Sequence, residues 1–233
     1  MNLKNKTVVI TGGSEGLGFS LAKKFSSLGA NIHIISRNKN KLDKAVESIG
    51  LNIIGHMADV SNTSDIERIT SEIGEVDVLI NNAGVWIEGL ITDNSVEEIS
   101  TAIDINLKGV IYTTKAFLSK LLEANEAHVL NIISTSGFKG RANQSVYAAA
   151  KFGVSGFTQA LEEDLIDTNV KVSGFYPGGM NTTLFQKAGS SKGGSDWMDT
   201  DKVAELIAFM IEQDATMVID HVVLNKRKTK TSN

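Results

Sequence analysis

Residues 7–18 read TVVITGGSEGLG, a β-branched apolar run that passes directly into a glycine-rich turn. The run predicts a buried strand, because a nearly continuous apolar stretch suits a parallel strand that is covered on both faces. An amphipathic pattern typical of a helix follows at Leu17–Leu28. A strand, a tight turn and a helix in this order predict the first unit of an α/β fold.

The same alternation continues along the chain. We expect strands at Thr7–Thr11, Asn31–Ile35, Asn52–His56, Val76–Ile80, His128–Ile133, Val170–Tyr176 and Met217–Leu224. We expect helices at Leu17–Leu28, Lys39–Ile49, Ser64–Ile73, Val96–Leu122, Val146–Ile166 and Asp201–Ile211. The sequence therefore predicts an α/β fold with one Rossmann-type doubly wound parallel sheet of about seven strands, flanked by helices on both faces.

The 233 residues have the length and composition of one globular α/β domain, with 42% hydrophobic and 21% charged residues and no repeat or linker. We expect residues 1–225 to form this domain and residues 226–233 to form a basic, flexible tail. Four of the 23 basic residues lie in that tail, which leaves 19 basic against 27 acidic residues elsewhere. An acidic body argues against nucleic acid as the main partner.

Several classes of protein are excluded by what the sequence lacks. No cysteine is present, which excludes disulfides, thiolate metal ligands and a cysteine nucleophile, and we expect no metal site. No apolar run approaches the roughly 20 residues that span a bilayer, so no membrane partner is expected. Met1 leads directly into a strand-like run without room for a signal peptide, and we therefore expect a cytoplasmic location.

The glycine-rich turn is a candidate phosphate-binding site. Gly12, Gly16 and Gly18 allow a tight turn and a close approach of the backbone to a pyrophosphate at the N-terminus of the following helix. Glycines of this kind also occur in turns that bind nothing, but the strand before and the helix after supply the required context. The three residues between the first two glycines differ from the spacing of the common dinucleotide fingerprint.

The end of the second strand should show which dinucleotide binds. An acid there would bind the ribose 2′-hydroxyl of NAD. Residues 36–39 instead read SRNK, and the first acid afterwards is Asp43. A hydroxyl, a guanidinium and an ammonium suit a 2′-phosphate, which Arg37 could bind bidentately, so NADP(H) is favoured over NAD(H). Glu15 opposes this interpretation, because it adds negative charge near the phosphates.

Tyr147 and Lys151 are the candidate acid–base pair. They are four residues apart and lie on one face of a predicted helix. A free tyrosine hydroxyl has a pKa of about 10, and a nearby ammonium would lower it by stabilising the phenolate. The pair alone is a weak signal, because most pairs at this spacing lie on helix surfaces.

Taken together, these motifs resemble the classical short-chain dehydrogenase/reductase family, from Lys6 to about Leu224. The resemblance implies a cofactor site formed by Gly12, Ser14, Glu15, Gly16, Leu17, Gly18, Ser36, Arg37, Asp59, Val60, Asn82, Ala83, Gly84, Tyr147, Lys151, Pro177, Gly178 and Thr182. Asp59 is expected near the adenine amino group and Thr182 near the nicotinamide carboxamide. The only proline of the chain, Pro177, lies in the motif that ends at Thr182.

The resemblance also implies the catalytic residues Ser134, Tyr147, Lys151 and Asn106. Ser134 lies 13 residues before Tyr147, which is the family spacing for the serine that orients the substrate; Ser136 is the alternative. Asn106 matches the helix asparagine that holds a water in the proton relay. Lys151 would lower the pKa of Tyr147 and bind the nicotinamide ribose.

The implied function is an NADP(H)-dependent oxidoreductase that reduces a ketone or aldehyde to an alcohol, or performs the reverse reaction. A non-catalytic NADP(H) sensor and an isomerase or dehydratase of the same family are the alternatives. Trp86, Phe138 and Gly179 are expected to line the pocket for a small-molecule substrate, under a mobile lid at Gln186–Asp199. The family resemblance implies a homodimer or homotetramer, although the usual glycine pair near the C-terminus is missing here.

Overall fold

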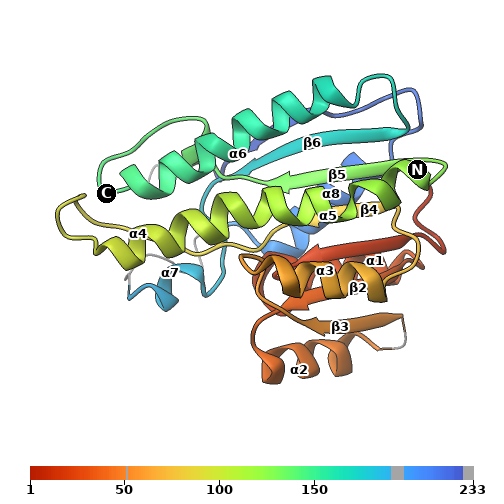
Figure 1. The fold of residues 1–233 in the computed structure, drawn as a ribbon, viewed down its shortest axis with the longest axis horizontal. Helices are drawn as coiled ribbons and strands as arrows, with labels where there is room; N and C mark the ends of the chain where they lie inside the picture. Colours follow the sequence, from red (N-terminus) through yellow and green to blue (C-terminus); the bar gives the residue numbers. More distant parts are fainter. Residues whose placement is uncertain (51, 190–196, 228–233) are drawn as a thin grey trace.

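The computed structural model describes residues 1–50, 52–189 and 197–227 (Figure 1). In this part of the chain the centre is one seven-stranded sheet in the order β3-β2-β1-β4-β5-β6-β7. Every neighbouring pair of strands is parallel. The strands are β1 (Thr7–Thr11), β2 (Asn31–Ser36), β3 (Ile53–Met57), β4 (Val78–Asn81), β5 (Ala127–Ile132), β6 (Val170–Pro177) and β7 (His221–Leu224). The doubly wound parallel sheet predicted from the sequence is confirmed.

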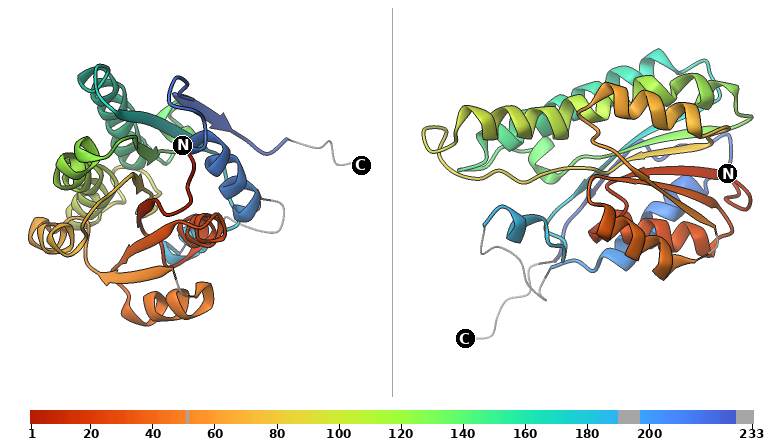
Figure 2. Two further views of the ribbon diagram at one scale, coloured as in Figure 1. Left: turned by 90° about the vertical axis from the view of Figure 1, so that its right-hand side faces the viewer. Right: turned by 60° about the horizontal axis from the view of Figure 1, so that its bottom comes forward.

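Helices cover both faces of the sheet, as the end-on view in Figure 2 shows. One face carries α1 (Gly16–Ser27), α2 (Lys39–Ile49) and α8 (Thr200–Ile211), which share an apolar cluster with β1 and β2. The other face carries α3 (Thr63–Glu72), α5 (Gly109–Glu123) and α6 (Ser145–Asp164). Two covered faces explain why the strands are apolar at consecutive positions.

Side chains alternate between these two layers along each central strand. In β1, Val8 and Ile10 enter the cluster on the α1 face, whereas Val9 enters the cluster on the α5 face. In β5, Leu130 and Val129 divide in the same way. This period of two follows from strand geometry and places the core in two slabs, one on each side of the sheet.

Two predicted elements differ from the structure. The helix expected at Val96–Leu122 is divided into α4 (Val96–Ile103), a π-helical segment η1 (Asp104–Lys108) and α5. The last strand begins at His221 rather than at Met217, because the Met217 N–H closes a turn onto the Asp214 carbonyl. A short helix, α7 (Leu184–Lys187), and a 3₁₀ turn, η2 (Thr135–Gly137), were not predicted.

The order of the strands determines where a ligand can bind. From β1 the chain proceeds outward to β2 and β3, and then returns to the other side of β1 at β4. The crevice at such a switch point, outside the carboxyl ends of the strands, is the usual ligand site of an open α/β sheet. Among the described residues, no helix has the length and apolarity that crossing a membrane requires.

Candidate active site

An open cavity of about 790 Å³ lies at the carboxyl edge of the sheet. A second cavity of about 490 Å³ adjoins it and shares Gly12, Glu15 and Ala83 with it. The larger cavity brings together all four predicted catalytic residues, which are Asn106, Ser134, Tyr147 and Lys151. These residues come from η1, the end of β5 and α6, so the fold assembles the site from distant parts of the sequence.

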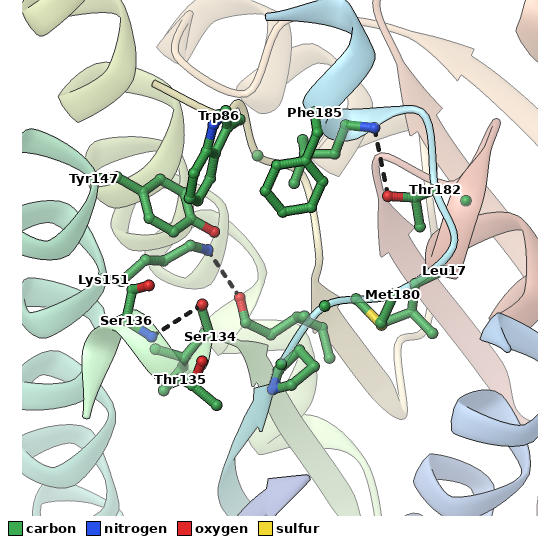
Figure 3. A pocket seen from close by; sticks show the side chains of 18 of the residues that line it. Leu17, Trp86, Ser134, Thr135, Ser136, Tyr147, Lys151, Met180, Thr182 and Phe185 are labelled. Atoms are coloured by element: carbon green, nitrogen blue, oxygen red, sulfur yellow. Dashed lines mark hydrogen bonds between the residues drawn. The ribbon is translucent and has the colours of Figure 1, made fainter. Parts of the chain in front are cut away.

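Tyr147 and Lys151 lie one turn apart on α6 and point into the larger cavity (Figure 3). Both side chains are buried, and the Lys151 ammonium lies 5.9 Å from the centre of the Tyr147 ring. The Lys151 Nζ donates a hydrogen bond of 3.0 Å to the carbonyl of Ile132, at the end of β5. This bond fixes the lysine between the helix and the sheet, with the tyrosine hydroxyl beside it.

The expected lowering of the Tyr147 pKa by Lys151 is not what the structure shows. Burial raises the pKa of Tyr147 to about 12, and a hydrogen bond with Ser134 opposes this only in part. Burial also lowers the pKa of Lys151 to about 8, because its charged form is desolvated. At neutral pH the tyrosine is therefore a neutral proton donor, and the lysine is still mostly cationic.

Ser134 rather than Ser136 lies beside Tyr147. The Ser134 Oγ accepts a hydrogen bond of 3.1 Å from the Ser136 N–H, and the Ser134 hydroxyl is also hydrogen-bonded with Tyr147. The Ser136 Oγ instead donates to the Gln144 Oε1 at 2.9 Å. Ser136 therefore holds the loop before α6, and Ser134 faces the cavity.

The amide of Asn106 clamps the loop that follows β4. Its Oδ1 accepts from the Val85 N–H at 3.0 Å, and its Nδ2 donates to the carbonyls of Val85 and Ala102, each at 2.9 Å. Gly84 is required beside it, because a Cβ there would lie 2.9 Å from the Asn106 Oδ1. Both amide hydrogens are thus engaged by the protein itself, and the expected water-holding role of Asn106 stays a prediction.

The glycine-rich turn forms a cradle that fits a pyrophosphate. Gly12 has a φ of 66° and Gly16 a φ of 55°, and a Cβ on Gly18 would lie 2.3 Å from the Gly12 carbonyl oxygen. Glu15, the N-cap of α1, makes no side-chain cap, so the first N–H groups of the helix lack a partner of that kind. Gly16 and Leu17 line the cavity at this point, where free N–H groups and the helix dipole favour an anion.

Glu15 does not place an uncompensated charge in that cradle. Its carboxylate pairs with Lys41 at 2.9 Å and also with Lys187, and it accepts a hydrogen bond from the Thr183 hydroxyl at 3.0 Å. Although burial disfavours its ionised form, the bonds from Lys187 and Lys41 hold the pKa of the Glu15 carboxyl below its usual value. The objection that Glu15 raised against a phosphate ligand is thereby removed.

The second cavity has the donors that a 2′-phosphate needs. Ser14, Ser36, Arg37 and Lys41 line it, and the hydroxyls of the two serines are hydrogen-bonded at 2.7 Å. The ammonium expected from Lys39 comes instead from Lys41, because Lys39 is exposed and pairs with Asp43 at 2.8 Å. Both lysines lie on the first turn of α2, and they differ only in the direction of the side chain. The sequence alone does not show which of the two points into the cavity.

Two of the predicted cofactor residues lie outside the lining of both cavities. Gly18 supports the turn through its close packing on Gly12. The Asp59 carboxylate accepts from the Ser61 N–H at 2.9 Å and pairs with Arg37 at 3.3 Å. The other predicted cofactor residues do line a cavity; these are Gly12, Ser14, Glu15, Gly16, Leu17, Ser36, Arg37, Val60, Asn82, Ala83, Gly84, Tyr147, Lys151, Pro177, Gly178 and Thr182.

Of the three predicted substrate-pocket residues, Trp86 and Gly179 line the larger cavity, whereas Phe138 lines neither cavity. Phe138 follows the 3₁₀ turn and is 68% exposed to solvent. Trp86 packs between Tyr147 and Phe185, with a ring-centre distance of 4.6 Å to each (Figure 3). The aromatic wall continues to Trp197, which lies 4.7 Å from Phe185.

Sequence reasoning missed several lining residues, namely Arg141, Gln144, Met180, Leu184, Phe185, Asn225, Lys226 and Arg227. Asn225 directly precedes the segment that was expected to be a flexible tail, and Lys226 and Arg227 are its first two residues. The rest of that segment, residues 228–233, lies outside the described part. Residues 190–196 of the expected lid at Gln186–Asp199 also lie outside it. Arg141 could have been predicted from its position in the loop before Tyr147. The three C-terminal residues could have been predicted from their position directly after the last strand, at the edge of the sheet where a ligand is expected.

Known proteins share the sequence and the fold. Residues 6–193 match the family model described as short chain dehydrogenase. An uncharacterized oxidoreductase of Staphylococcus epidermidis is 31% identical over 226 residues, which cover 95% of this chain and 97% of the relative.

Two solved structures extend the comparison over nearly the whole chain. The closed form of serine dehydrogenase complexed with NADP⁺ has a TM-score of 0.88 and 27% identity, and the match covers 97% of this chain and 98% of that one. A 3-ketoacyl-(acyl-carrier-protein) reductase from Brucella melitensis complexed with NADH has a TM-score of 0.86 and 28% identity, and the match covers 96% of this chain and 98% of that one.

Proposed function

This chain is an oxidoreductase that belongs to the short chain dehydrogenase family, and from this premise we propose that it interconverts a carbonyl group and an alcohol with NADP(H) as its cofactor. One observation carries the proposal. A buried tyrosine hydroxyl, the Ser134 hydroxyl and the Lys151 ammonium line one cavity, and that cavity continues to the anion cradle at the start of α1.

The side chains of the site account for the chemistry at the carbonyl oxygen. In the reduction, the Ser134 and Tyr147 hydroxyls donate hydrogen bonds to the oxygen of the substrate. Tyr147 then transfers its proton to that oxygen, because a neutral phenol is the form that burial favours here. A bound nicotinamide cofactor supplies the hydride that the carbonyl carbon accepts. The product has gained one hydride at carbon and one proton at oxygen.

Lys151 supports this proton transfer through its charge. Loss of the proton leaves a phenolate in a buried site, and a nearby cation stabilises that charge. Because the ammonium is fixed by the Ile132 carbonyl, it does not need to reorganise during the reaction. Asn106 contributes by holding the Val85 loop against the reaction centre.

The preference for NADP(H) rests on the second cavity. A 2′-phosphate would meet the Ser14 and Ser36 hydroxyls, the Arg37 guanidinium and the Lys41 ammonium. The two nearby acids are already paired, Asp59 with Arg37 and Glu15 with Lys41. Serine dehydrogenase has NADP⁺ in its similar structure, whereas the Brucella reductase has NADH, so the choice depends on these side chains rather than on the fold.

Assembly into a homodimer or homotetramer and a cytoplasmic location stay predictions. The surface of α6 favours an oligomer, because Phe152 is 46% exposed and a Cβ on Gly156 would meet nothing within 4 Å. Gly153 has a different role, since a Cβ there would lie 2.9 Å from the Leu107 side chain within the same chain.

The test is NADPH oxidation by the purified chain with a panel of aldehydes, ketones, diketones and quinones. The change Tyr147→Phe should lower turnover by about 10²–10⁴-fold, because it removes the proton donor. NADPH binding, followed by cofactor fluorescence, should be nearly unaffected. Tyr112→Phe is the matched control, since Tyr112 lies on α5 and does not line the cavity.

Two results would contradict the proposal. Near-wild-type activity in the Tyr147→Phe variant would refute the role of Tyr147. Binding of NADPH without net consumption by any carbonyl compound would favour a sensor or an isomerase of the same family.

A further inference from the structure

We propose that the substrate is a carbonyl compound that carries an anionic group, a carboxylate or a phosphate, and that Arg141 and Arg227 bind this group. The inference rests on the proposed carbonyl–alcohol chemistry and extends it to the class of substrate. Both arginines line the cavity that contains Ser134 and Tyr147, and neither lines the second cavity, where the donors for a 2′-phosphate lie.

Arg141 projects from a loop that is fixed at its base. Gln144, at the end of this loop, is buried and accepts the hydrogen bond from Ser136 at 2.9 Å. The Asn143 carbonyl accepts from the Gly89 N–H at 3.0 Å, which ties the loop to the segment after β4. Arg141 itself is exposed, and within the described residues it has no hydrogen bond or ion pair. Its guanidinium is available to a ligand beside the reaction centre.

Arg227 reaches the same cavity from the last strand. β7 pairs with β6 so that Leu224 lies opposite Pro177, and the Gly178 N–H donates to the Leu224 carbonyl at 2.7 Å. The chain therefore leaves the sheet at its carboxyl edge, beside the proline–glycine turn that lines the cavity. Arg227 follows Leu224 by three residues, and this register of β7 therefore places it in the lining of the cavity.

The charges of the cavity are unbalanced. Within the described lining residues, the only carboxylate is that of Glu15, and Lys187 and Lys41 compensate it. Lys151 is bonded at the reaction centre. Beside it remain the guanidinium groups of Arg141 and Arg227, in a protein whose net charge is −4. A concave site of one sign concentrates the opposite charge, and guanidinium groups bind carboxylates and phosphates bidentately.

Another part of the same wall is apolar and aromatic, because Phe185 packs against both Trp86 and Trp197. A substrate with an apolar body and an anionic end would match both parts. Suitable probes are therefore 4-carboxybenzaldehyde and its uncharged methyl ester. Dihydroxyacetone phosphate and dihydroxyacetone form a second pair, which distinguishes a phosphate from a carboxylate.

The experiment compares kcat/KM for NADPH-dependent reduction within each pair. At least one charged probe should exceed its neutral partner by roughly tenfold at low ionic strength, and high salt should reduce the difference. The double change R141Q/R227Q should bring that ratio close to one. Lys139→Gln should keep it, because Lys139 is exposed in the same loop but does not line the cavity. A wild-type ratio near one for both pairs, or a ratio that R141Q/R227Q leaves intact, would overturn the inference.

A binding assay separates this inference from the proposed reaction. Both tryptophans of the chain line the cavity, so their fluorescence reports occupancy without turnover. Benzoate should bind at least tenfold more tightly than benzamide, and R141Q/R227Q should abolish the difference. If this holds while none of the carbonyl probes is reduced, the anion site stands and the proposed reaction fails. If the probes are reduced but benzoate binds no better than benzamide and the phosphate pair also gives a kcat/KM ratio near one, the anion site is wrong.

Discussion

Arg37 has two possible partners, the carboxylate of Asp59 and the 2′-phosphate of the proposed cofactor NADP(H). In the structure it pairs with Asp59 at 3.3 Å, with both side chains partly exposed to solvent. An exposed ion pair of this kind contributes little, about 0–1 kcal/mol, so a phosphate dianion can displace the carboxylate. A bidentate guanidinium–phosphate contact is stronger and also more specific in its geometry.

We therefore predict that Arg37→Asp lowers the ratio of kcat/KM for NADPH to that for NADH by about 10²-fold, because a favourable charge is replaced by a repulsive one. Steady-state kinetics with both cofactors and one carbonyl substrate measure the ratio. Lys39→Met is the control, since Lys39 pairs with Asp43 outside the second cavity. An unchanged ratio in the Arg37→Asp variant would reject the 2′-phosphate site.

At this scale the sequence predicts a residue well when its position follows from a short motif. Tyr147 and Lys151 are one helical turn apart, so their shared face follows from helix geometry alone. Arg37 comes directly after a buried strand, so its place at the sheet edge is also predictable. Arg227 and Phe138 were not predictable, because their exposure depends on how a chain end and a loop pack against distant elements.

At the scale of the secondary-structure elements, the π-helical segment η1 places Asn106 at the cavity. Apolar periodicity predicts one continuous helix from Val96, and nothing in residues 104–108 marks the extra residue per turn. In η1 the Gly109 N–H bonds to the Asp104 carbonyl, five residues back. Such a bulge is frequently found at functional sites. Here it contains Asn106, whose amide makes its three hydrogen bonds to Val85 and Ala102.

We predict that Asn106→Ala destabilises the protein by about 2–4 kcal/mol, because main-chain groups of the partly buried Val85 and the buried Ala102 lose their partner. Turnover should fall as well, because the Val85 loop is released beside Trp86. Urea unfolding gives the free energy, and hydrogen exchange at the Val85 amide gives the local effect. Thr101→Ala, on the exposed face of α4, is the matched control. A loss of turnover with unchanged stability and exchange would show that the clamp is unimportant.

At the scale of the whole molecule, the two halves of the sheet meet between β1 and β4, and buried amides connect β4 to β5 and to the helices beside them. The Asn81 Nδ2 donates to the Asn131 Oδ1 at 2.8 Å and to the Thr114 hydroxyl at 2.9 Å. Asn131 in turn donates to the Thr158 hydroxyl on α6 at 2.9 Å. The sequence predicts the strands and the doubly wound parallel sheet, because apolar runs alternate with crossover helices. It does not predict this polar network, which depends on the register between β4 and β5.

His128 lies near the start of β5, at the end of the sheet away from the cavity, and its side chain is buried. This histidine should make the fold sensitive to acid. The Ser173 Oγ donates to the Ile219 carbonyl at 2.8 Å, so its contact of 2.8 Å with the His128 Nε2 requires the imidazole to donate. The His128 Nδ1 is then an acceptor without a hydrogen-bond partner among the described residues. A proton on that nitrogen would find no acceptor. Burial, with Lys171 and the N-terminal ammonium nearby, lowers the pKa of His128 to about 3.

This lowered pKa gives the direction of the pH dependence. Between the ordinary histidine pKa of about 6.5 and the folded value, the unfolded chain binds a proton that the folded chain does not. The stabilisation is therefore fully present above pH 6.5 and is lost as the pH falls towards 3. By pH 5 we expect a loss of roughly 2 kcal/mol relative to neutral pH from this residue alone. Urea unfolding at pH 7 and pH 5 measures the difference, and His128→Gln should reduce it while keeping a donor for Ser173. His221→Gln, at the exposed end of β7, should leave the difference unchanged, and equal losses in all three proteins would show that His128 does not control acid stability.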